Sequence, residues 1–186
     1  MDVKEAIFTR RSGRFYTDEY LKDEDVDLLL EAATMAATAS ALEPWGFVVI
    51  RDEAEIQELN QVTKAANLKL LPELPYLEKY RGWFENEKFS IFNRTKNLIA
   101  IYGDTNAHFY KYDCTLAAAN IMLLAHSMNI GVCWVGLADR TLNTSEFKAA
   151  HNVPDHFSLV AALTMGYSRK KLNPPVRRPP LVFSRK

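Results

Sequence analysis

The stretch YDCTLAAANIMLLAHSMNIGVCWVG, Tyr112–Gly136, decides the fold that the sequence predicts. Its first part is apolar nearly all round and rich in alanine, which is typical of a helix buried in the middle of a protein. We expect this helix to run from about Thr105 to Asn129, and we expect GVCWVG, residues 131–136, to follow as a strand or a strand-like loop. The apolar run is shorter than the ~20 residues that a transmembrane helix needs, so no membrane span is predicted.

Further helices and strands are expected on both sides of this segment. Apolar residues three and four positions apart indicate helices, and short β-branched runs indicate strands. The expected helices cover 2–10, 23–38, 54–66 and about 145–150, and the expected strands cover 47–51, 98–102 and 157–167. Asp2, Asp23 and either Thr144 or Ser145 are the expected helix caps. Because the pattern lacks regular βαβ alternation, the predicted class is α+β, in one domain of residues 1–186.

Two segments do not fit into this regular pattern. Residues 67–96 read as a variable helical or loop insertion, whose aromatic side chains either line an active site or fill core: Tyr76, Tyr80, Trp83, Phe84, Phe89 and Phe92. The tail NPPVRRPPLVFSRK, residues 173–186, is too rich in proline to form a helix. Its apolar residues Leu181–Phe183 have no local support, so we expect the tail to pack against a second copy of the chain in a dimer.

The charge of the chain gives no sign of a nucleic-acid or membrane partner. Lys plus Arg equals Asp plus Glu at 23 each, so there is no overall basic field. Cys114 and Cys133 have neither CxxC nor metal-type spacing, which favours a reducing compartment and predicts no metal site. The first residues lack the apolar core of a signal peptide, so a cytoplasmic location is expected.

The common catalytic motifs are also absent. The sequence has no GxGxxG, GxxxxGK[ST], GxSxG or HExxH motif, and its four histidines are scattered. Apolar surroundings raise the pKa of both cysteine thiols, which argues against a thiolate nucleophile. His126 is best interpreted as a core or helix-end histidine.

Clustered arginines are the remaining chemical signal. Arg10, Arg11, Ser12 and Arg14 lie near the start of the chain, and Arg177 and Arg178 lie in the tail. Guanidinium groups bind phosphate oxygens in pairs, and a serine hydroxyl adds a neutral donor, so the two clusters together predict a phosphate site. Taken alone, the first cluster would be a solvated turn.

Four segments, in order along nearly the whole chain, resemble the nitroreductase family of FMN-dependent oxidoreductases. RRSGRFY is similar to the family's N-terminal RRSxRxF motif, and ASALEPWGFVVI is similar to its PSSxNxQPWxFxVV segment. The opening stretch 112–136 resembles DxGxAxxNLLLAAxxLGLGxCWxG, and RRPPLVF occupies the place of the RxRxPL tail. This resemblance implies a central, mostly antiparallel sheet flanked by helices, a buried central helix and a C-terminal tail exchanged in a dimer.

The resemblance also implies a set of FMN-binding residues. Arg10, Ser12 and Arg14 would hold the phosphate and ribityl chain, together with Arg177 or Arg178. Arg11 belongs to the same motif, although its side chain is best assigned to solvent or structure. Thr38, Ala39 and Ser40 would come from the partner subunit, and the backbone of Trp134, Val135, Gly136 and Leu137 would face the isoalloxazine ring. Asn93 or Lys96 would supply a further polar contact.

The activity implied by the resemblance is hydride transfer from NAD(P)H, through flavin N5, to a flat acceptor such as a nitroaromatic compound or a quinone. The two substrates would bind in turn, in a ping-pong cycle, and residues 67–96 would wall the open face of the flavin. A homodimer would carry FMN sites at its subunit interface. No side chain of the chain itself is required as a catalytic acid or base.

The sequence departs from the family pattern in the segment assigned to the partner's flavin. Ala37-Thr38-Ala39 replaces Pro-Ser-Ser, Ala41 replaces Asn and Glu43 replaces Gln. This loss of side-chain donors leaves open a second hypothesis, a protein of the same fold that stores or senses FMN without turning it over. A third hypothesis, an arginine-based module that binds anions without flavin, is disfavoured by the neutral charge.

Overall fold

The computed structural model describes residues 1–186 as a four-stranded sheet with helices on both faces. The α-helices are α1 (Val3–Thr9), α2 (Asp23–Thr34), α3 (Glu53–Lys69), α4 (Arg81–Glu85), α5 (Tyr110–Ser127) and α6 (Ser145–Ala150). The strands are β1 (Trp45–Ile50), β2 (Asn97–Asp104), β3 (Ile130–Trp134) and β4 (Phe157–Tyr167), and short 3-10 helices form η1 (Ala39–Ala41), η2 (Pro75–Tyr80), η3 (Gly136–Ala138) and η4 (Thr141–Asn143). These elements confirm the predicted α+β class.

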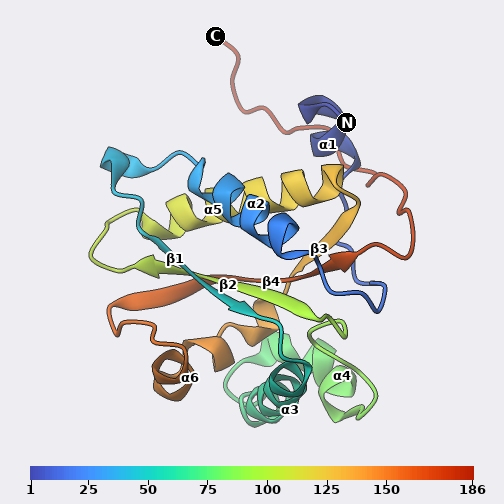
Figure 1. The fold of residues 1–186 in the computed structure, drawn as a ribbon, viewed down its shortest axis with the longest axis vertical. Helices are drawn as coiled ribbons and strands as arrows, with labels where there is room; N and C mark the ends of the chain where they lie inside the picture. The colour runs from blue at the N-terminus through green and yellow to red at the C-terminus, as the bar shows by residue number, and fades with distance from the viewer.

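The sheet separates two hydrophobic cores. Its strand order is β1-β2-β4-β3, and every neighbouring pair is antiparallel. Helices α1, α2 and α5 lie over one face, and α3, α4 and α6 lie over the other (Figure 1). Side chains of the central strand β2 alternate between the two cores, so that Ile99 and Ile101 pack with α5 while Leu98 and Ala100 pack with α3. No helix is both long and apolar enough to cross a bilayer.

The N-terminal segment that carries the first arginine cluster lies along the outer edge of β3. Ser12 forms a parallel bridge with Val132, and the Gly13 amide donates to the Val132 carbonyl at 3.0 Å. The buried hydroxyl of Tyr16 donates to the Gly13 carbonyl at 2.8 Å and also lies within hydrogen-bond distance of Thr164. This part of the chain is therefore an extended segment fixed to the sheet, and it covers an otherwise exposed strand edge.

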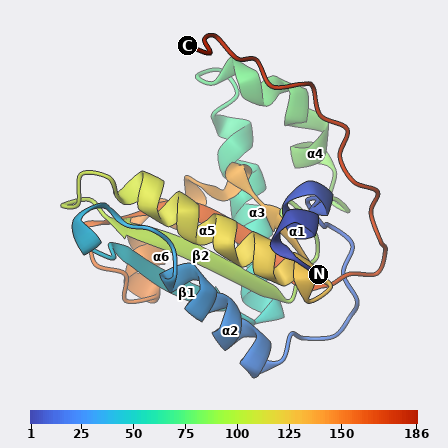
Figure 2. The same ribbon diagram turned by 90° about the horizontal axis from the view of Figure 1, so that it is seen from above.

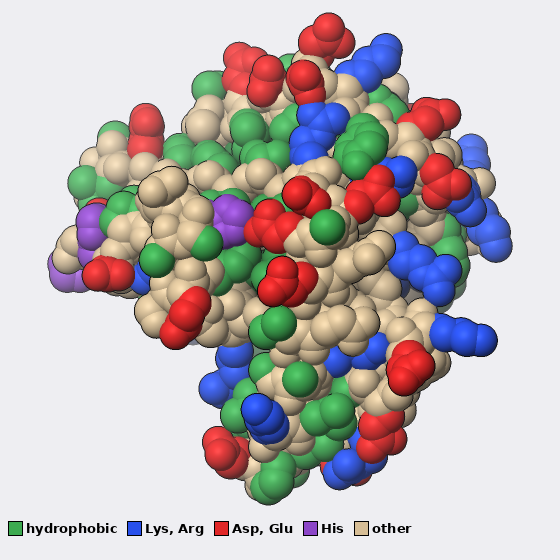
Figure 3. All heavy atoms as spheres, turned by 60° about the horizontal axis from the view of Figure 1, so that its bottom comes forward, with side chains coloured by type: hydrophobic (Ala, Val, Ile, Leu, Met, Phe, Trp, Pro, Cys, Tyr) green, Lys and Arg blue, Asp and Glu red, His purple; other side chains and the backbone are tan.

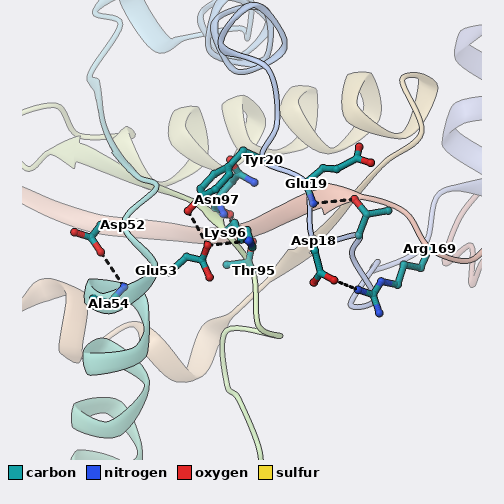
Figure 4. A network of polar contacts seen from close by, with 11 residues as sticks. Asp18, Glu19, Tyr20, Asp52, Glu53, Ala54, Thr95, Lys96, Asn97 and Arg169 are labelled. Carbon is teal, nitrogen blue, oxygen red and sulfur yellow. Dashed lines mark hydrogen bonds and ion pairs between the residues drawn. The ribbon is translucent and has the colours of Figure 1, made fainter.

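A second set of contacts fixes the same segment to the other side of the molecule. The Tyr20 hydroxyl donates to Glu53, at the start of α3, at 2.7 Å, and Lys96 forms an ion pair with the same carboxylate at 2.8 Å (Figure 4). Arg169 forms an ion pair with Asp18 at 2.9 Å. Residues 12–20 thus connect the start of α3 with the ends of β3 and β4.

Two helix boundaries differ from the prediction. Helix α2 ends at Thr34 rather than near Thr38, because the Ala39 amide donates to the Asp113 side chain instead of to a helical carbonyl. Asp23 is the first helical residue rather than the cap, and its carboxylate forms an ion pair with Arg51. Helix α5 begins at Tyr110 rather than at Thr105, since the Asp104 side chain accepts from the Asn106 amide and favours a turn there.

The central helix α5 is covered on one side only. Cys114, Ala117, Ala118 and Ile121 are buried against the sheet and α2. On the other side, Tyr112 and Leu116 are 70% and 46% exposed. The expected buried central helix is therefore packed against the sheet and α2, while its other side is open in the single chain.

The proline-rich tail contains no helix or strand after Ser168, as predicted, and leaves the body of the molecule beyond α1 (Figures 1 and 2). Its apolar side chains Leu181 and Phe183 are exposed. The exchange of this tail between subunits stays a prediction.

Close packing of Tyr16 against β4 predicts a stability difference between two glycine substitutions. A Cβ atom on Gly166 would lie 2.8 Å from the Cβ atom of Tyr16, whereas a Cβ on Gly82, in α4, would meet nothing within 4 Å. We expect Gly166→Ala to lower the free energy of unfolding by about 1–3 kcal/mol. Gly82→Ala should leave it unchanged or raise it by up to about 1 kcal/mol. Urea unfolding measures both, and equal effects would contradict the packing described here.

Candidate functional site

A cleft of about 1120 Å³ lies beside the end of β3. One wall comes from residues 76–91, and the other comes from residues 133–143, which follow β3. Arg14, Asn67 and Asn93 complete the lining. The cleft therefore collects one residue of the N-terminal arginine cluster, the segment after β3 and the aromatic insertion.

The segment after β3 presents its backbone to the cleft. The Val135 amide donates to the Ala162 carbonyl at 2.8 Å, which continues the sheet for one more residue before η3 begins. Gly136 is exposed, and a Cβ atom on it would meet no other atom within 4 Å. Packing within the chain does not require glycine here, so a flat ligand could approach this backbone closely.

The aromatic insertion divides into core and cleft residues. Leu77, Phe84 and Phe92 are buried in the core on the α3 side of the sheet. Trp83 stacks on Phe89 with ring centroids 4.9 Å apart, and Tyr80 lies 5.0 Å from Trp83. Tyr76 and Trp83 are 61% and 45% exposed where they line the cleft. The segment therefore contributes some residues to the core and others to the cleft.

Helix α3 holds both walls through buried polar side chains. The Lys64 ammonium, in a residue only 3% exposed, donates to the carbonyls of Asn86 and Phe89 at 2.6 and 3.2 Å. The Asn67 amide donates to the Leu137 carbonyl at 3.0 Å on the opposite wall. Because hydrogen bonds from charged and buried donors are costly to lose, these side chains fix the width of the cleft.

The arginines of the N-terminal cluster have different environments. Arg14 lines the cleft, and neither it nor Arg10 forms an ion pair with an acidic side chain. Arg11 donates to the Asn173 carbonyl at 3.2 Å and so holds the start of the tail, in line with its expected structural role. Burial raises the pKa of the Cys133 thiol, and the nearby Arg14 opposes this increase.

The end of α1, just before Arg10, is attached to the end of α5. The Thr9 hydroxyl donates to the Glu5 carbonyl at 2.6 Å and lies 2.8 Å from Nε2 of His126. The Thr9 hydroxyl therefore connects the last turn of α1 to His126, in the last turn of α5. Burial lowers the pKa of His126, and the Arg10 charge lowers it further. His126 is thus a helix-end histidine, as the sequence suggested.

The loop that contains Thr38, Ala39 and Ser40 lies near the opposite end of α5. Its Ala39 amide donates to Asp113, in the first turn of the helix. From Asp113 to His126 the helix rises by about 20 Å, at roughly 1.5 Å per residue. No residue of this loop lines the cleft of its own chain.

The cleft is lined by Arg14 together with four residues of the segment after β3, namely Trp134, Val135, Gly136 and Leu137. The sequence analysis assigned these five residues to one site. The other predicted site residues lie outside the lining. They are Arg10, Arg11 and Ser12, on the same segment as Arg14, and also Thr38–Ser40, Arg177 and Arg178. Asn93 lines the cleft, whereas Lys96 is directed to Glu53 (Figure 4).

Acidic and basic side chains are interspersed over the face in Figure 3, which fits the balanced charge.

Sequence reasoning missed a polar group at one end of the cleft. Asp139, Arg140 and Asn143 line it, and burial raises the pKa of the Asp139 carboxyl. Sequence reasoning also missed Lys64 and Asn67. The only available signal was their separation by three residues, which places them on one face of a helix. Polar residues with this spacing ordinarily indicate a solvent-exposed face.

The buried position of Lys64 generates a testable difference between two lysines of α3. We expect Lys64→Met to lower the free energy of unfolding by about 1–3 kcal/mol, since two carbonyls lose a charged donor. Lys69→Met, at an exposed position of the same helix, should change it by less than about 0.5 kcal/mol. Chemical denaturation compares the two variants, and similar values would mean that Lys64 does not hold the cleft wall.

Comparison with known proteins places this chain in one family. A Methanothermobacter thermautotrophicus protein named "Putative NADH dehydrogenase/NAD(P)H nitroreductase" is 29% identical over 168 residues, covering 90% of this chain and 78% of the relative. The FMN reductase (NADPH) of Bacillus subtilis is 26% identical over 176 residues, covering 88% of this chain and 64% of the relative.

Solved structures share the same fold. The crystal structure of a Bacteroides fragilis nitroreductase with bound FMN aligns over 100% of both chains, with a TM-score of 0.86 and 22% identity. Residues 7–167 match the nitroreductase family, which confirms the resemblance and the enzyme class expected from the sequence. The chain belongs to the nitroreductase family of flavin oxidoreductases.

Proposed function

We propose that this protein is an FMN-dependent oxidoreductase that uses NAD(P)H to reduce flat acceptors such as nitroaromatic compounds and quinones. The observation that carries the proposal is the cleft, where an arginine without an acidic partner, an open backbone segment and exposed aromatic rings meet. When bound, FMN supplies the hydride-transfer chemistry, accepting from NAD(P)H and donating to the acceptor in separate half-reactions. The FMN in the B. fragilis structure and the name of the B. subtilis relative support this assignment.

The residues present fit an FMN group. Arg14, with Arg10 and Ser12 on the same fixed segment, offers charge-assisted donors to a phosphate. Gly136 leaves room for a ring against the backbone. The Val135 amide is already bonded to Ala162, so the amides of Gly136 and Leu137 are the donors that this segment can offer to a ring edge. Such fixed donors stabilise negative charge that develops on a bound group.

Asn93 fits the role of a polar contact better than Lys96. Its side-chain amide donates to the Thr164 hydroxyl at 3.1 Å, which orients it within the lining of the cleft. Its backbone has a φ of 55°, in the left-handed region that asparagine adopts more readily than most residues.

The proposed enzyme is a homodimer that shares its FMN sites between subunits. The Thr38–Ser40 loop lies near the end of α5 opposite the one that holds Arg10, and it does not line the cleft of its own chain, which fits a role beside the flavin of a second copy. The exposed apolar side of α5, with Tyr112 and Leu116, and the uncovered tail with Arg177 and Arg178 supply surface for that copy. The tail arginines would then reach a phosphate across the interface.

The aromatic wall suits flat acceptors. Tyr76 and Trp83 offer faces on which an aromatic ring or quinone can stack. At the far end, Asp139, Arg140 and Asn143 add polar groups that can contact substituents of the acceptor. We propose that residues 67–96 form the substrate-facing insertion of a single domain of residues 1–186.

A non-catalytic FMN protein is the second candidate, because Ala39 and Ala41 have no side-chain donors for the ring. Purified protein loaded with FMN distinguishes the two. Oxidation of NADH or NADPH that depends on a nitroaromatic or quinone acceptor is the expected result. A protein that holds flavin stoichiometrically but never turns over would favour the storage role, and one that takes up no flavin would contradict both.

Two arginines of the first cluster should differ in their effect on FMN. We expect Arg14→Ala to weaken FMN binding by about ten-fold or more, because it removes charge-assisted hydrogen bonds in the cleft. Arg11→Ala, which removes only the contact with the Asn173 carbonyl, should change the affinity by less than about three-fold. Fluorescence titration of the apoprotein with FMN measures both, with thermal unfolding as a check on folding. Unchanged affinity in Arg14→Ala would overturn the phosphate assignment.

A further inference from the structure

Asp113 is a buried acid with a single hydrogen-bond partner. Only 4% of the residue is exposed, and its two carboxylate oxygens both lie 3.3 Å from the Ala39 amide nitrogen. No other hydrogen bond reaches this side chain. Its position in the first turn of α5 favours a negative charge, because the N-terminal end of a helix carries a partial positive charge. The carboxylate is therefore placed to hold one backbone group of the 38–43 loop.

The 38–43 loop needs such an anchor. Ser40, Ala41 and Glu43 have φ values of 53°, 52° and 45°, and none of them is a glycine. A loop with strained residues keeps its shape only where its surroundings impose it. No side chain of this loop donates or accepts a hydrogen bond, and its one internal backbone bond joins the Leu42 amide to the Ala39 carbonyl at 3.2 Å. The contact between Asp113 and Ala39 is thus the side-chain tether of the loop to the rest of the chain.

We propose that Asp113 is a positioning residue that fixes the 38–43 loop for the flavin site of the partner subunit. This inference rests on the proposed function, since it requires FMN at a subunit interface. The loop lies about 20 Å along α5 from the end that holds Arg10, and none of its residues lines the cleft of its own chain. Here the side chains at 39 and 41 are alanines, so the loop can contact a flavin mainly through its backbone. The position of that backbone depends on Asp113.

Two single substitutions test the tether itself. Asp113→Ala removes the acceptor, and a misplaced loop should lower kcat/KM for the acceptor by about ten- to hundred-fold. Asp113→Asn keeps an oxygen that accepts from the Ala39 amide and should recover most of that loss. If Asp113→Ala retains wild-type kcat/KM, the proposal is wrong. If Asp113→Asn is as impaired as Asp113→Ala, the tether is not what matters and the proposal is also wrong.

A third variant breaks the same contact from the other side. Ala39→Pro removes the amide proton and leaves the Asp113 carboxylate intact. Ala39 is the first residue of η1, where proline is tolerated, and Thr38 has the extended conformation that a following proline requires. This variant should show the same loss as Asp113→Ala. It keeps the test decisive if a buried alanine at 113 prevents folding, and wild-type activity in Ala39→Pro would contradict the tether.

The assignment across subunits is tested by complementation. Differently tagged Asp113→Ala and Arg14→Ala chains are co-expressed, and the mixed dimer is purified through both tags. One of its sites then combines an intact Arg14 with an intact loop, and the other site lacks both. We expect one bound FMN per mixed dimer and about half of the wild-type activity, well above either parent, because a two-fold dimer has two equivalent sites. The pair Ala39→Pro and Arg14→Ala should behave in the same way.

The outcomes separate this inference from the proposed function. If the mixed dimer is no more active than its Asp113→Ala parent, while Arg14→Ala alone has lost FMN, then the flavin site stands and Asp113 does not act on the partner. If the wild-type protein takes up no FMN, the proposed function has failed. In that case the inference falls with the function on which it rests.

Discussion

The packing of α5 on the central strands is the constraint on which the rest of the structure depends. The helix faces the sheet with Ala117, Ala118 and Ala125, so its axis can approach Ile99 and Leu163 closely. Because an α-helix is stiff and rises by about 1.5 Å per residue, its two ends have fixed positions relative to the sheet. Asp113 at one end holds the 38–43 loop, and His126 at the other end holds the start of the arginine segment. The helix thereby sets the distance between two parts of the proposed site.

Because the two ends of α5 lie a fixed distance apart, a single chain carries an apolar surface and a loop that have no partner within that chain. One side of α5 remains apolar and exposed, and the strained loop at its first turn faces no cleft of its own chain. Exposed apolar patches commonly mark an interface. Strained backbone and an uncovered apolar surface at the same end of a helix are both costly to a monomer. A second copy, related by a two-fold axis, would use both features at once.

The sequence predicts most of the fold because much of it depends on local physics. Asp2 and Thr144 cap their helices through bonds to residues three positions away, and the β-branched runs form strands at the expected places. Ala39 could not be placed from sequence, because its partner Asp113 is 74 residues away and replaces a helical hydrogen bond. The role of Lys64 could not be predicted from the sequence either. A lysine on a mixed helical face normally indicates solvent exposure, and only the fold brings the carbonyls of Asn86 and Phe89 to it.

The two walls of the cleft are fixed by different contacts, although helix α3 contributes to both, and this difference has a consequence for function. Arg14 and the segment after β3 are fixed by the sheet, through Gly13, Tyr16 and the Val135 amide. The aromatic wall is instead fixed by Lys64, through the carbonyls of Asn86 and Phe89. Substitutions in residues 76–91 can therefore alter which acceptor stacks on the wall without disturbing the groups proposed to hold the phosphate. In such an arrangement the choice of acceptor is free to change while cofactor binding is retained.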